Sequence, residues 1–316
     1  MKTGWNEIEL NGARQWVSVR GDPAAPTLLF LHGGPGGAEY GPRRHYLRSL
    51  ESQWRVVDWD QRGAGRSYRG DETSETLSLD ILVADGLALV ERFRSDTGGR
   101  PVVLAGHSFG TVLGVLMASR APGSLAGYVG AAQVVDWGLQ EERSYDWALA
   151  EAGRTGNTKA VAALEGIGRP VRGSYPGGRE AVEVQRRWLG SLGGVSGDPR
   201  FLLRWLRSIL LAGDYPIRTK LRFTKGMSRS MDLIWAELGE RIEFSRDVSA
   251  LDVPIHLFAG DRDRITDLAQ VRPWFDALQA PSKRLEVVEG VGHLGLFEAP
   301  ARFAEFMGGV RTSVRG

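Results

Sequence analysis

Short apolar runs alternate with longer amphipathic segments along the first third of the chain. The runs are rich in β-branched, leucine and aromatic residues, are bounded by turn residues and occupy 27–32, 54–60 and 101–106. Apolar residues recur every three or four positions at 43–51, 77–95 and 111–121. The runs are typical of buried strands and the recurring pattern of helices. This alternation predicts a parallel sheet with helices on both faces.

A hairpin is predicted before these units. In the stretch IELNGARQWVSV, Asn11 and Gly12 separate two runs in which apolar and polar residues alternate. Asn-Gly is the strongest short-range signal for a two-residue hairpin turn, because both residues tolerate positive φ angles. We therefore expect two antiparallel strands on either side of this dipeptide.

The pattern changes between residues 136 and 246. Strand signals are missing there, helical stretches such as 198–213 and 230–242 dominate, and five of the ten tryptophans fall in this segment. Strand-like runs return at 253–260 and 284–290, each followed by a helical pattern. We therefore predict a core formed by 1–135 and 247–316, interrupted by a helical cap at 136–246. A tryptophan-rich cap favours a substrate with a hydrophobic portion. Ordinary packing between cap and core is the alternative interpretation, and the better one for most of these tryptophans.

Composition excludes several classes of function. The chain has 316 residues, 42% of them hydrophobic, and lacks the roughly 18 uninterrupted apolar residues of a membrane span. Its N-terminal residues lack the apolar stretch of a signal peptide, so we expect a cytoplasmic protein without a membrane partner. Cysteine is absent, and the five histidines form no HExxH pair, so neither a thiolate nucleophile nor a metal site is expected. The net charge is +2, and the basic residues form no polybasic block, which argues against nucleic acid.

A G-x-S-x-G pattern, Gly106-His107-Ser108-Phe109-Gly110, stands where a buried strand gives way to a helical segment. A serine at so tight a turn has strained backbone angles, and bulky neighbours two residues away would collide. The alternative interpretation is a serine that only caps a helix. The strand-to-helix context favours a nucleophile elbow with Ser108 as the nucleophile.

A serine nucleophile needs a histidine as base and a carboxylate that orients it, in the chain order Ser, acid, His. After Ser108 only His256 and His293 remain. His256 lies in the middle of an apolar run, where packing is the better interpretation. His293 follows a strand in a glycine-flanked loop, so we assign it the role of base.

The orienting acid should follow the strand that ends at Gly260. Asp263 is our choice, because the acid of such enzymes commonly lies three residues after the glycine that ends the strand. Asp261 more often caps or stiffens the turn. Asp136, which follows the apolar stretch GYVGAAQVV, is a second possible location.

The loop LHGGPGG (31–37) first suggests a phosphate cradle. A Walker loop needs a lysine that this region lacks, and a dinucleotide fingerprint needs a third glycine where Glu39 stands. The remaining use of such a backbone is to direct N–H groups at an oxyanion. One donor would be Phe109, the residue after the nucleophile, and the other Gly34 in this loop.

Five blocks, HGGPGG (32–37), DQRGAGRS (60–67), GHSFG (106–110), GDRD (260–263) and GVGH (290–293), together resemble the α/β-hydrolase superfamily, specifically its proline iminopeptidase-like branch. The resemblance implies an α/β-hydrolase fold, with a mostly parallel eight-stranded sheet, an inserted helical cap and no cofactor. It implies a triad of Ser108, Asp263 and His293, with Gly34 and Phe109 as the oxyanion hole. Asp60 and Arg62 would be structural.

The chain also departs from that branch. Its elbow reads GHSFGT where the branch resembles GGSWGS, and Ala64 stands where a cysteine is usual. The branch uses cap glutamates to hold the free amino group of its substrate. Glu237 and Asp232 are the candidates here, with solvated helix faces as the alternative interpretation.

These observations predict a serine hydrolase that cleaves an ester or amide bond of a small, partly hydrophobic molecule or short peptide through an acyl-enzyme. A proline iminopeptidase-like aminopeptidase or amidase is one form of it, and a carboxylesterase or lactonase is the other. A non-hydrolytic ligand-binding or tailoring protein on the same fold is the alternative of a different class. Epoxide or haloalkane hydrolysis would need a carboxylate in place of Ser108.

Overall fold

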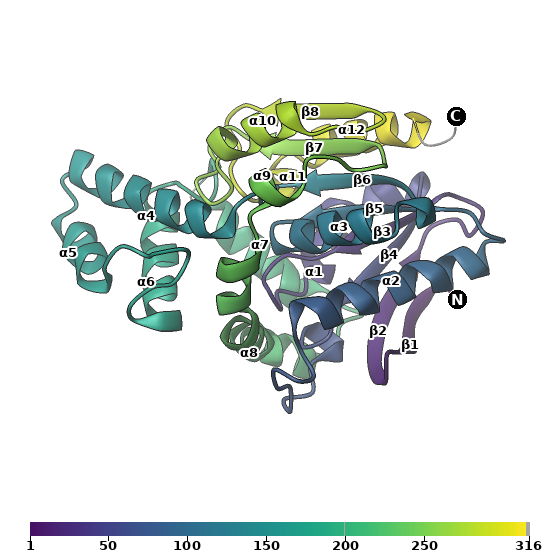
Figure 1. Cartoon of the computed structure of the whole chain (residues 1–316). Coiled ribbons are helices and arrows are strands. Elements are labelled where there is room, and N and C mark those ends of the chain that lie inside the picture. The colour runs from purple at the N-terminus through teal and green to yellow at the C-terminus, as the bar shows by residue number, and fades with distance from the viewer. Residues whose placement is uncertain (199, 314–316) are drawn as a thin grey trace.

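The computed structural model describes residues 1–198 and 200–313, which fold around one eight-stranded sheet (Figure 1). The strand order is β1-β2-β4-β3-β5-β6-β7-β8. The strands are β1 (Gly4–Leu10), β2 (Ala13–Arg20), β3 (Thr27–Leu31), β4 (Arg55–Asp60), β5 (Val102–His107), β6 (Leu125–Ala131), β7 (Ile255–Gly260) and β8 (Lys283–Val288). β1 and β2 join the sheet antiparallel, and the other neighbours pair in parallel. The predicted mostly parallel sheet of eight strands is confirmed.

The predicted hairpin is also confirmed. Leu10 pairs with Ala13 across a two-residue turn, in which Asn11 and Gly12 have φ angles of 46° and 75°. Both values lie in the left-handed region that a tight hairpin turn of this kind requires.

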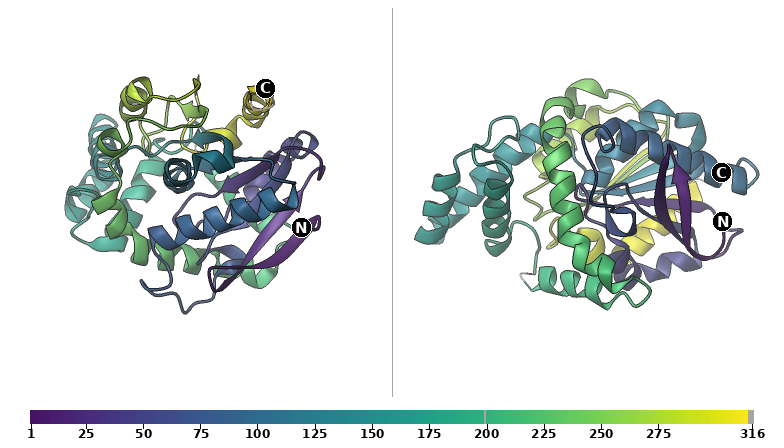
Figure 2. Two further views of the ribbon diagram at one scale, coloured as in Figure 1. Left: turned by 45° about the vertical axis from the view of Figure 1, so that its right-hand side comes forward. Right: turned by 90° about the horizontal axis from the view of Figure 1, so that it is seen from below.

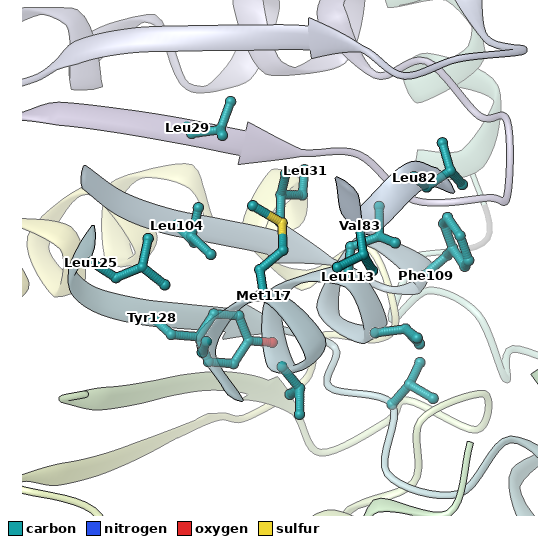
Figure 3. Packing of buried hydrophobic residues seen from close by; sticks show 14 of the residues in the cluster. Leu29, Leu31, Leu82, Val83, Leu104, Phe109, Leu113, Met117, Leu125 and Tyr128 are labelled. Carbon is teal, nitrogen blue, oxygen red and sulfur yellow. The ribbon is translucent and has the colours of Figure 1, made fainter. Parts of the chain in front are cut away.

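Side chains of β3 alternate between the two faces of the sheet, and each face is covered by helices. Leu29 and Leu31 pack in one cluster with residues of α2 and α3, where Figure 3 shows them near Leu104 and Met117. Leu28 and Phe30 belong to a second cluster on the opposite face, with residues of η1, α11 and α12. The helices of the core are α1 (Tyr40–Tyr46), η1 (Arg48–Ser52), η2 (Gly65–Ser67), α2 (Leu79–Asp96), α3 (Phe109–Arg120), η3 (Pro122–Ser124), α10 (Leu268–Ala277), α11 (Gly295–Glu298) and α12 (Pro300–Ser313).

The helix expected at 43–51 is divided in two. α1 ends at Tyr46, Leu47 leaves helical geometry with φ −115° and ψ 23°, and η1 starts at Arg48. The break places both Leu47 and Leu50 in the apolar cluster of that face. The burial of these two leucines in the core outweighs the helical propensity of the segment, which by itself favours one continuous helix.

The segment 136–246 contains helices, and its described residues include only isolated bridges in place of strands. Its helices are α4 (Trp137–Arg154), α5 (Thr158–Ile167), α6 (Gly178–Ser191), α7 (Phe201–Leu211), α8 (Ile217–Arg241) and α9 (Phe244–Asp247). α4, α5 and α6 share their own apolar cluster and project beyond the sheet, at the left of Figure 1. α8 instead runs against the core, where it contacts η2 and α2. Within the described residues, no helix has the length and apolar character needed to cross a bilayer.

Candidate active site

The strand-to-helix turn after β5 holds Ser108 in an unusual backbone conformation. Its φ and ψ angles are 50° and −121°, a strained combination for a residue with a side chain. A Cβ atom on Gly106 would lie 2.5 Å from the carbonyl oxygen of Gly110, and one on Gly110 would lie 2.0 Å from that of Leu31. Both glycines of the pattern are therefore required by the close approach of the backbone.

The structure brings together the three residues predicted as a triad. The distance from Ser108 Oγ to His293 Nε2 is 2.9 Å, and that from His293 Nδ1 to Asp263 Oδ2 is also 2.9 Å. Asp263 and His293 are 2% and 7% exposed, whereas Ser108 is partly open to solvent. This arrangement can pass a proton from the hydroxyl to a histidine that a buried carboxylate orients.

Asp263 is held as a carboxylate by its neighbours. It accepts hydrogen bonds from the backbone N–H groups of Ile265 (2.7 Å) and Thr266 (2.9 Å) and from the Thr266 hydroxyl (2.5 Å). Burial raises the pKa of Asp263, but His293 and the Thr266 donors outweigh burial and hold that pKa below its usual value. An ionised Asp263 keeps the proton on His293 Nδ1 and leaves Nε2 free to accept one.

The alternative acids lie elsewhere. Asp261 accepts a hydrogen bond from the backbone N–H of Gly290 at 2.7 Å, which joins the ends of β7 and β8. Asp136 caps α4 through the N–H of Leu139 at 2.9 Å. His256, the other histidine after Ser108, is buried and packs edge-on against Phe306.

The glycine-rich loop lies directly beside Ser108. A Cβ atom on Gly33 would come within 3.3 Å of the Ser108 Cβ. Gly34 is exposed between two buried neighbours and has a φ angle of 128°. Among the described residues, the backbone N–H groups of Gly34 and Phe109 donate to no protein acceptor. Two candidate oxyanion donors are thus left available on either side of the serine.

The cap carboxylates that we considered for an amino group have other partners. Glu237 accepts a hydrogen bond from the backbone N–H of Leu79 at 3.0 Å and forms an ion pair with Arg241. Asp232 forms an ion pair with Arg179 at 2.9 Å and lines a cavity of about 570 Å³ between α6 and α8. Ser108, Asp263 and His293 do not line that cavity. The structure does not bring Glu237 or Asp232 to the serine.

Asp60 and Arg62 hold the loop after β4. Asp60 is buried and accepts hydrogen bonds from the Arg66 N–H and the Tyr215 hydroxyl. Arg62 pairs with the buried Asp85 of α2 at 2.8 Å. These contacts agree with the structural role implied by the resemblance.

Sequence reasoning missed a buried pair behind the serine, Glu39 and His107. Glu39 Oε2 accepts a hydrogen bond from the Gly33 N–H at 3.0 Å, and Oε1 lies 2.7 Å from His107 Nδ1. His107 Nε2 lies 3.1 Å from the backbone carbonyl oxygen of His293. The pair therefore links the glycine-rich loop to the loop that carries the histidine. In the sequence Glu39 stands out only as a mismatch to a nucleotide fingerprint, because nothing in its context indicates burial.

Both ring nitrogens of His107 face oxygen acceptors, which requires a proton on each of them when Glu39 is ionised. Burial opposes the charged ring, but the charge of Glu39 and its hydrogen bond outweigh burial and raise the pKa of His107. The two contacts of the His107 ring and the direction of this shift favour an imidazolium–carboxylate pair behind the serine.

We expect the contribution of the His107–Glu39 pair to the free energy of unfolding to depend on pH. The pKa of His107 is higher in the folded protein than in the unfolded chain, where it has the usual histidine value of about 6.5. The pair therefore stabilises the fold fully below about pH 6.5, and this stabilisation is lost as the pH rises through the raised pKa. We expect Glu39→Gln to cost about 3 kcal/mol at low pH and clearly less at high pH. Denaturant unfolding of both proteins between pH 5.5 and about 9 measures this difference.

Glu72→Gln is a matched control, because Glu72 is also buried but its carboxylate accepts from the backbone N–H groups of Arg69 and Gly70. The loss in free energy of unfolding caused by Glu72→Gln should not become smaller over the same pH range. If the free energies of unfolding of Glu39→Gln and of the unsubstituted protein differed by the same amount at every pH, this would contradict a charged pair.

Residues 194–197 of the predicted cap form hydrogen bonds with the loops that carry Asp263 and His293. The N–H of His293 donates to the Val195 carbonyl oxygen at 2.8 Å, and that of Arg264 donates to Gly194 at 2.9 Å. Glu298 joins the same parts, since it accepts from Ser196 Oγ (2.9 Å) and from the N–H groups of Gly197 (2.9 Å) and Gly292 (3.1 Å). Residues 194–197 of the predicted cap thus contribute directly to the position of His293.

The sequence is similar to a known protein family and to an aminopeptidase-like protein. Residues 23–300 match the family model described as "Serine aminopeptidase, S33". The probable aminopeptidase YbaC of Bacillus subtilis is 28% identical over 301 residues, which cover 94% of this chain and 93% of that protein.

Two solved structures share the fold. The proline iminopeptidase-related protein TTHA1809 of Thermus thermophilus superposes with a TM-score of 0.69 at 23% identity, over 99% of both chains. The esterase RhEst1 of a Rhodococcus species superposes with a TM-score of 0.66 at 18% identity, over 99% of this chain and 100% of that one. At these identities the likeness establishes the fold, and the family model, which spans most of the chain, establishes the family. The chain belongs to the serine aminopeptidase S33 family of α/β-hydrolases.

Proposed function

We propose that the protein hydrolyses an ester or amide bond of a small, partly hydrophobic substrate through an acyl-enzyme on Ser108. The observation that carries this proposal is the chain of two hydrogen bonds, each 2.9 Å long, from Ser108 through His293 to Asp263. A serine hydroxyl is a weak nucleophile without such a base. The strained elbow also presents Ser108 to solvent while its two partners are buried.

In this mechanism Ser108 Oγ attacks the carbonyl carbon and His293 Nε2 takes the hydroxyl proton. The N–H groups of Gly34 and Phe109 would stabilise the negative charge on the carbonyl oxygen, each by roughly 3 kcal/mol in the transition state. His293 then protonates the leaving amine or alcohol, and a water molecule activated by the same histidine releases the acyl group. Asp263 stabilises the imidazolium that forms in both halves of the reaction.

The family favours an aminopeptidase or amidase, and the name of the Bacillus relative points the same way. An aminopeptidase needs a carboxylate near the serine to receive the ammonium group of its substrate.

An ester or lactone is the second candidate substrate, and the pairing of the cap carboxylates favours it. Glu237, Asp232 and the fully buried Glu141 each form an ion pair with an arginine. At Glu237 and Asp232 an ammonium group would have to displace an arginine. Glu141 differs, because Arg186 contacts its Oε1 whereas its Oε2 is buried without a hydrogen-bond partner among the described residues. The ion pairs of Glu237 and Asp232 therefore favour a substrate without a free amino group, and Glu141 is the cap carboxylate that an aminopeptidase would have to use.

One comparison separates the two candidates. We expect the ratio of kcat/KM between an aminoacyl p-nitroanilide and its N-acetylated counterpart to exceed roughly 100 if an ammonium site exists, because a lost charge-assisted contact costs about 3 kcal/mol. Equal turnover of the two would rule out the aminopeptidase and leave the ester substrates. p-Nitrophenyl esters and lactones are assayed alongside, with Ser108→Ala as the background control.

The non-hydrolytic alternative is tested by a fluorophosphonate probe, which forms a covalent bond with an activated serine. Labelling that requires both Ser108 and His293 supports the hydrolase. A protein that remains unlabelled and turns over none of the three substrate classes would instead support a binding function.

A further inference from the structure

α7 and the first turns of α8 expose an unusual number of large apolar side chains. In the described part of the chain, seven of the ten exposed large hydrophobic residues lie within this stretch of about twenty positions. They are Leu202, Leu203, Leu206, Leu210, Leu211, Ile217 and Leu221. Several of the seven are at least 60% exposed, and Leu221 reaches 70%. We call these seven residues the α7–α8 face.

The opposite side of α7 is already used for packing. Phe201, Trp205 and Ile209 are buried in the cluster that covers one side of the sheet, and the Trp205 ring lies 6.4 Å from that of Phe297. These three residues anchor α7 to the core. Leu203, Leu206 and Leu210 lie on another side of the same helix and are directed outwards. The exposure therefore belongs to a helix that is anchored on the core.

The two helices present their leucines together. Lys220 Nζ donates a hydrogen bond to the backbone carbonyl oxygen of Leu210 at 2.8 Å, which brings the first turns of α8 beside the end of α7. Figure 2 (right) shows this corner at the edge of the molecule, away from the sheet. Large apolar side chains exposed on two neighbouring helices usually mark an interaction site.

Basic residues are interspersed with the residues of the α7–α8 face. Residues 200–225 contain seven arginines and lysines and a single acid, Asp214, which is paired with Arg20. This segment carries a formal net charge of +6, of which one charge, that of Arg204, is paired with Asp198 just before it at 2.8 Å. The whole chain carries only +2. The basic residues are Arg200, Arg204, Arg207, Arg218, Lys220, Arg222 and Lys225. They are interspersed with the leucines along this one segment, and all except Lys220 are exposed.

We propose that the α7–α8 face binds the surface of an anionic lipid bilayer, with its leucines among the acyl chains and its arginines and lysines at the headgroups. Leucines flanked by basic residues on an anchored amphipathic helix are the features of helices that lie in the plane of a membrane. A symmetric contact with a second copy would oppose two surfaces of the same positive charge. The proposal departs from our expectation of no membrane partner. That expectation rested on the missing span and the missing signal-peptide stretch, neither of which a helix in the plane of a membrane requires.

Sedimentation with vesicles tests the proposal on the full chain. Binding should be weak to phosphatidylcholine vesicles, rise at least tenfold when phosphatidylglycerol is included, and fall again as salt is added. Leu203→Ser with Leu210→Ser should abolish the binding. Arg207→Gln with Arg222→Gln should weaken it on the order of tenfold. Both double variants replace exposed residues, so their turnover of a soluble substrate should match that of the unsubstituted protein.

Matched controls separate this surface from general hydrophobicity and charge. Leu139→Ser with Val171→Ser removes two exposed apolar residues elsewhere, and Arg92→Gln with Arg154→Gln removes two exposed charges elsewhere. Neither should change vesicle binding. Equal sedimentation with neutral and anionic vesicles, or equal losses in test and control variants, would overturn the proposal. So would a dimer in solution that the leucine variants dissociate, because a second copy would then cover the face.

Discussion

Ser108→Ala is expected to lower kcat for the best substrate of the screen by roughly four to six orders of magnitude. The substitution removes the attacking oxygen but leaves the His293–Asp263 hydrogen bond and the backbone donors in place. KM should change little, because the hydroxyl contributes its main interaction in the transition state. Steady-state kinetics together with loss of fluorophosphonate labelling measure the effect.

Thr111→Val is a suitable comparison for this variant. Its hydroxyl also lies at the start of α3, where it donates to the Ser108 carbonyl oxygen and accepts from the Val134 N–H. The hydrogen bonds of the described residues include none from this hydroxyl to His293. We expect this substitution to affect stability more than chemistry. Activity that survives Ser108→Ala would show that another group performs the attack, and would refute the proposed acyl-enzyme.

Asp263→Asn is expected to lower kcat by about three to four orders of magnitude, whereas Asp261→Asn should lower it less than about tenfold. An amide at 263 can still accept from the Thr266 N–H, but it no longer stabilises the imidazolium and favours the wrong tautomer of His293. Asp261 contacts the backbone of Gly290 and not the histidine ring. The pH profile of kcat, measured for both variants, should be altered only by the change at 263.

The two aspartates form their own matched pair, because both follow β7 within three residues and both accept backbone N–H groups. Unfolding in denaturant shows whether either variant loses stability. A severe loss of kcat in Asp261→Asn and a mild one in Asp263→Asn would mean that the acid was assigned to the wrong residue.

The pattern of apolar residues predicted most of the strands and helices of the core, because buried strands and amphipathic helices have distinct periods. The Asn11-Gly12 hairpin is the clearest case, since the turn requires left-handed backbone angles that these residues adopt easily. The division of the helix at Leu47 was not predictable in the same way. It depends on where the buried leucines meet the sheet, and this is a property of the assembled core.

Candidate active-site residues were predictable where their chemistry depends on local geometry. Ser108 is such a residue, because the glycines around it are needed by the turn itself. Glu39 and Glu298 were not found, since a carboxylate in a loop has the same sequence context whether it is solvated or buried. Their roles arise from contacts with residues that are distant along the chain, namely His107 and Ser196.

The sequence by itself determined the order of strands and helices, the elbow at Ser108 and the candidates for base and acid, because turn chemistry and hydrophobic period are local properties. Only the tertiary structure decided that His293 and Asp263 meet the serine, that Glu237 and Asp232 pair with arginines instead, and that the leucines of α7 and the first turns of α8 stay exposed. Those outcomes depend on which distant side chains become neighbours and on which lose contact with water. Hydrophobic burial and charge pairing across the whole fold determine both.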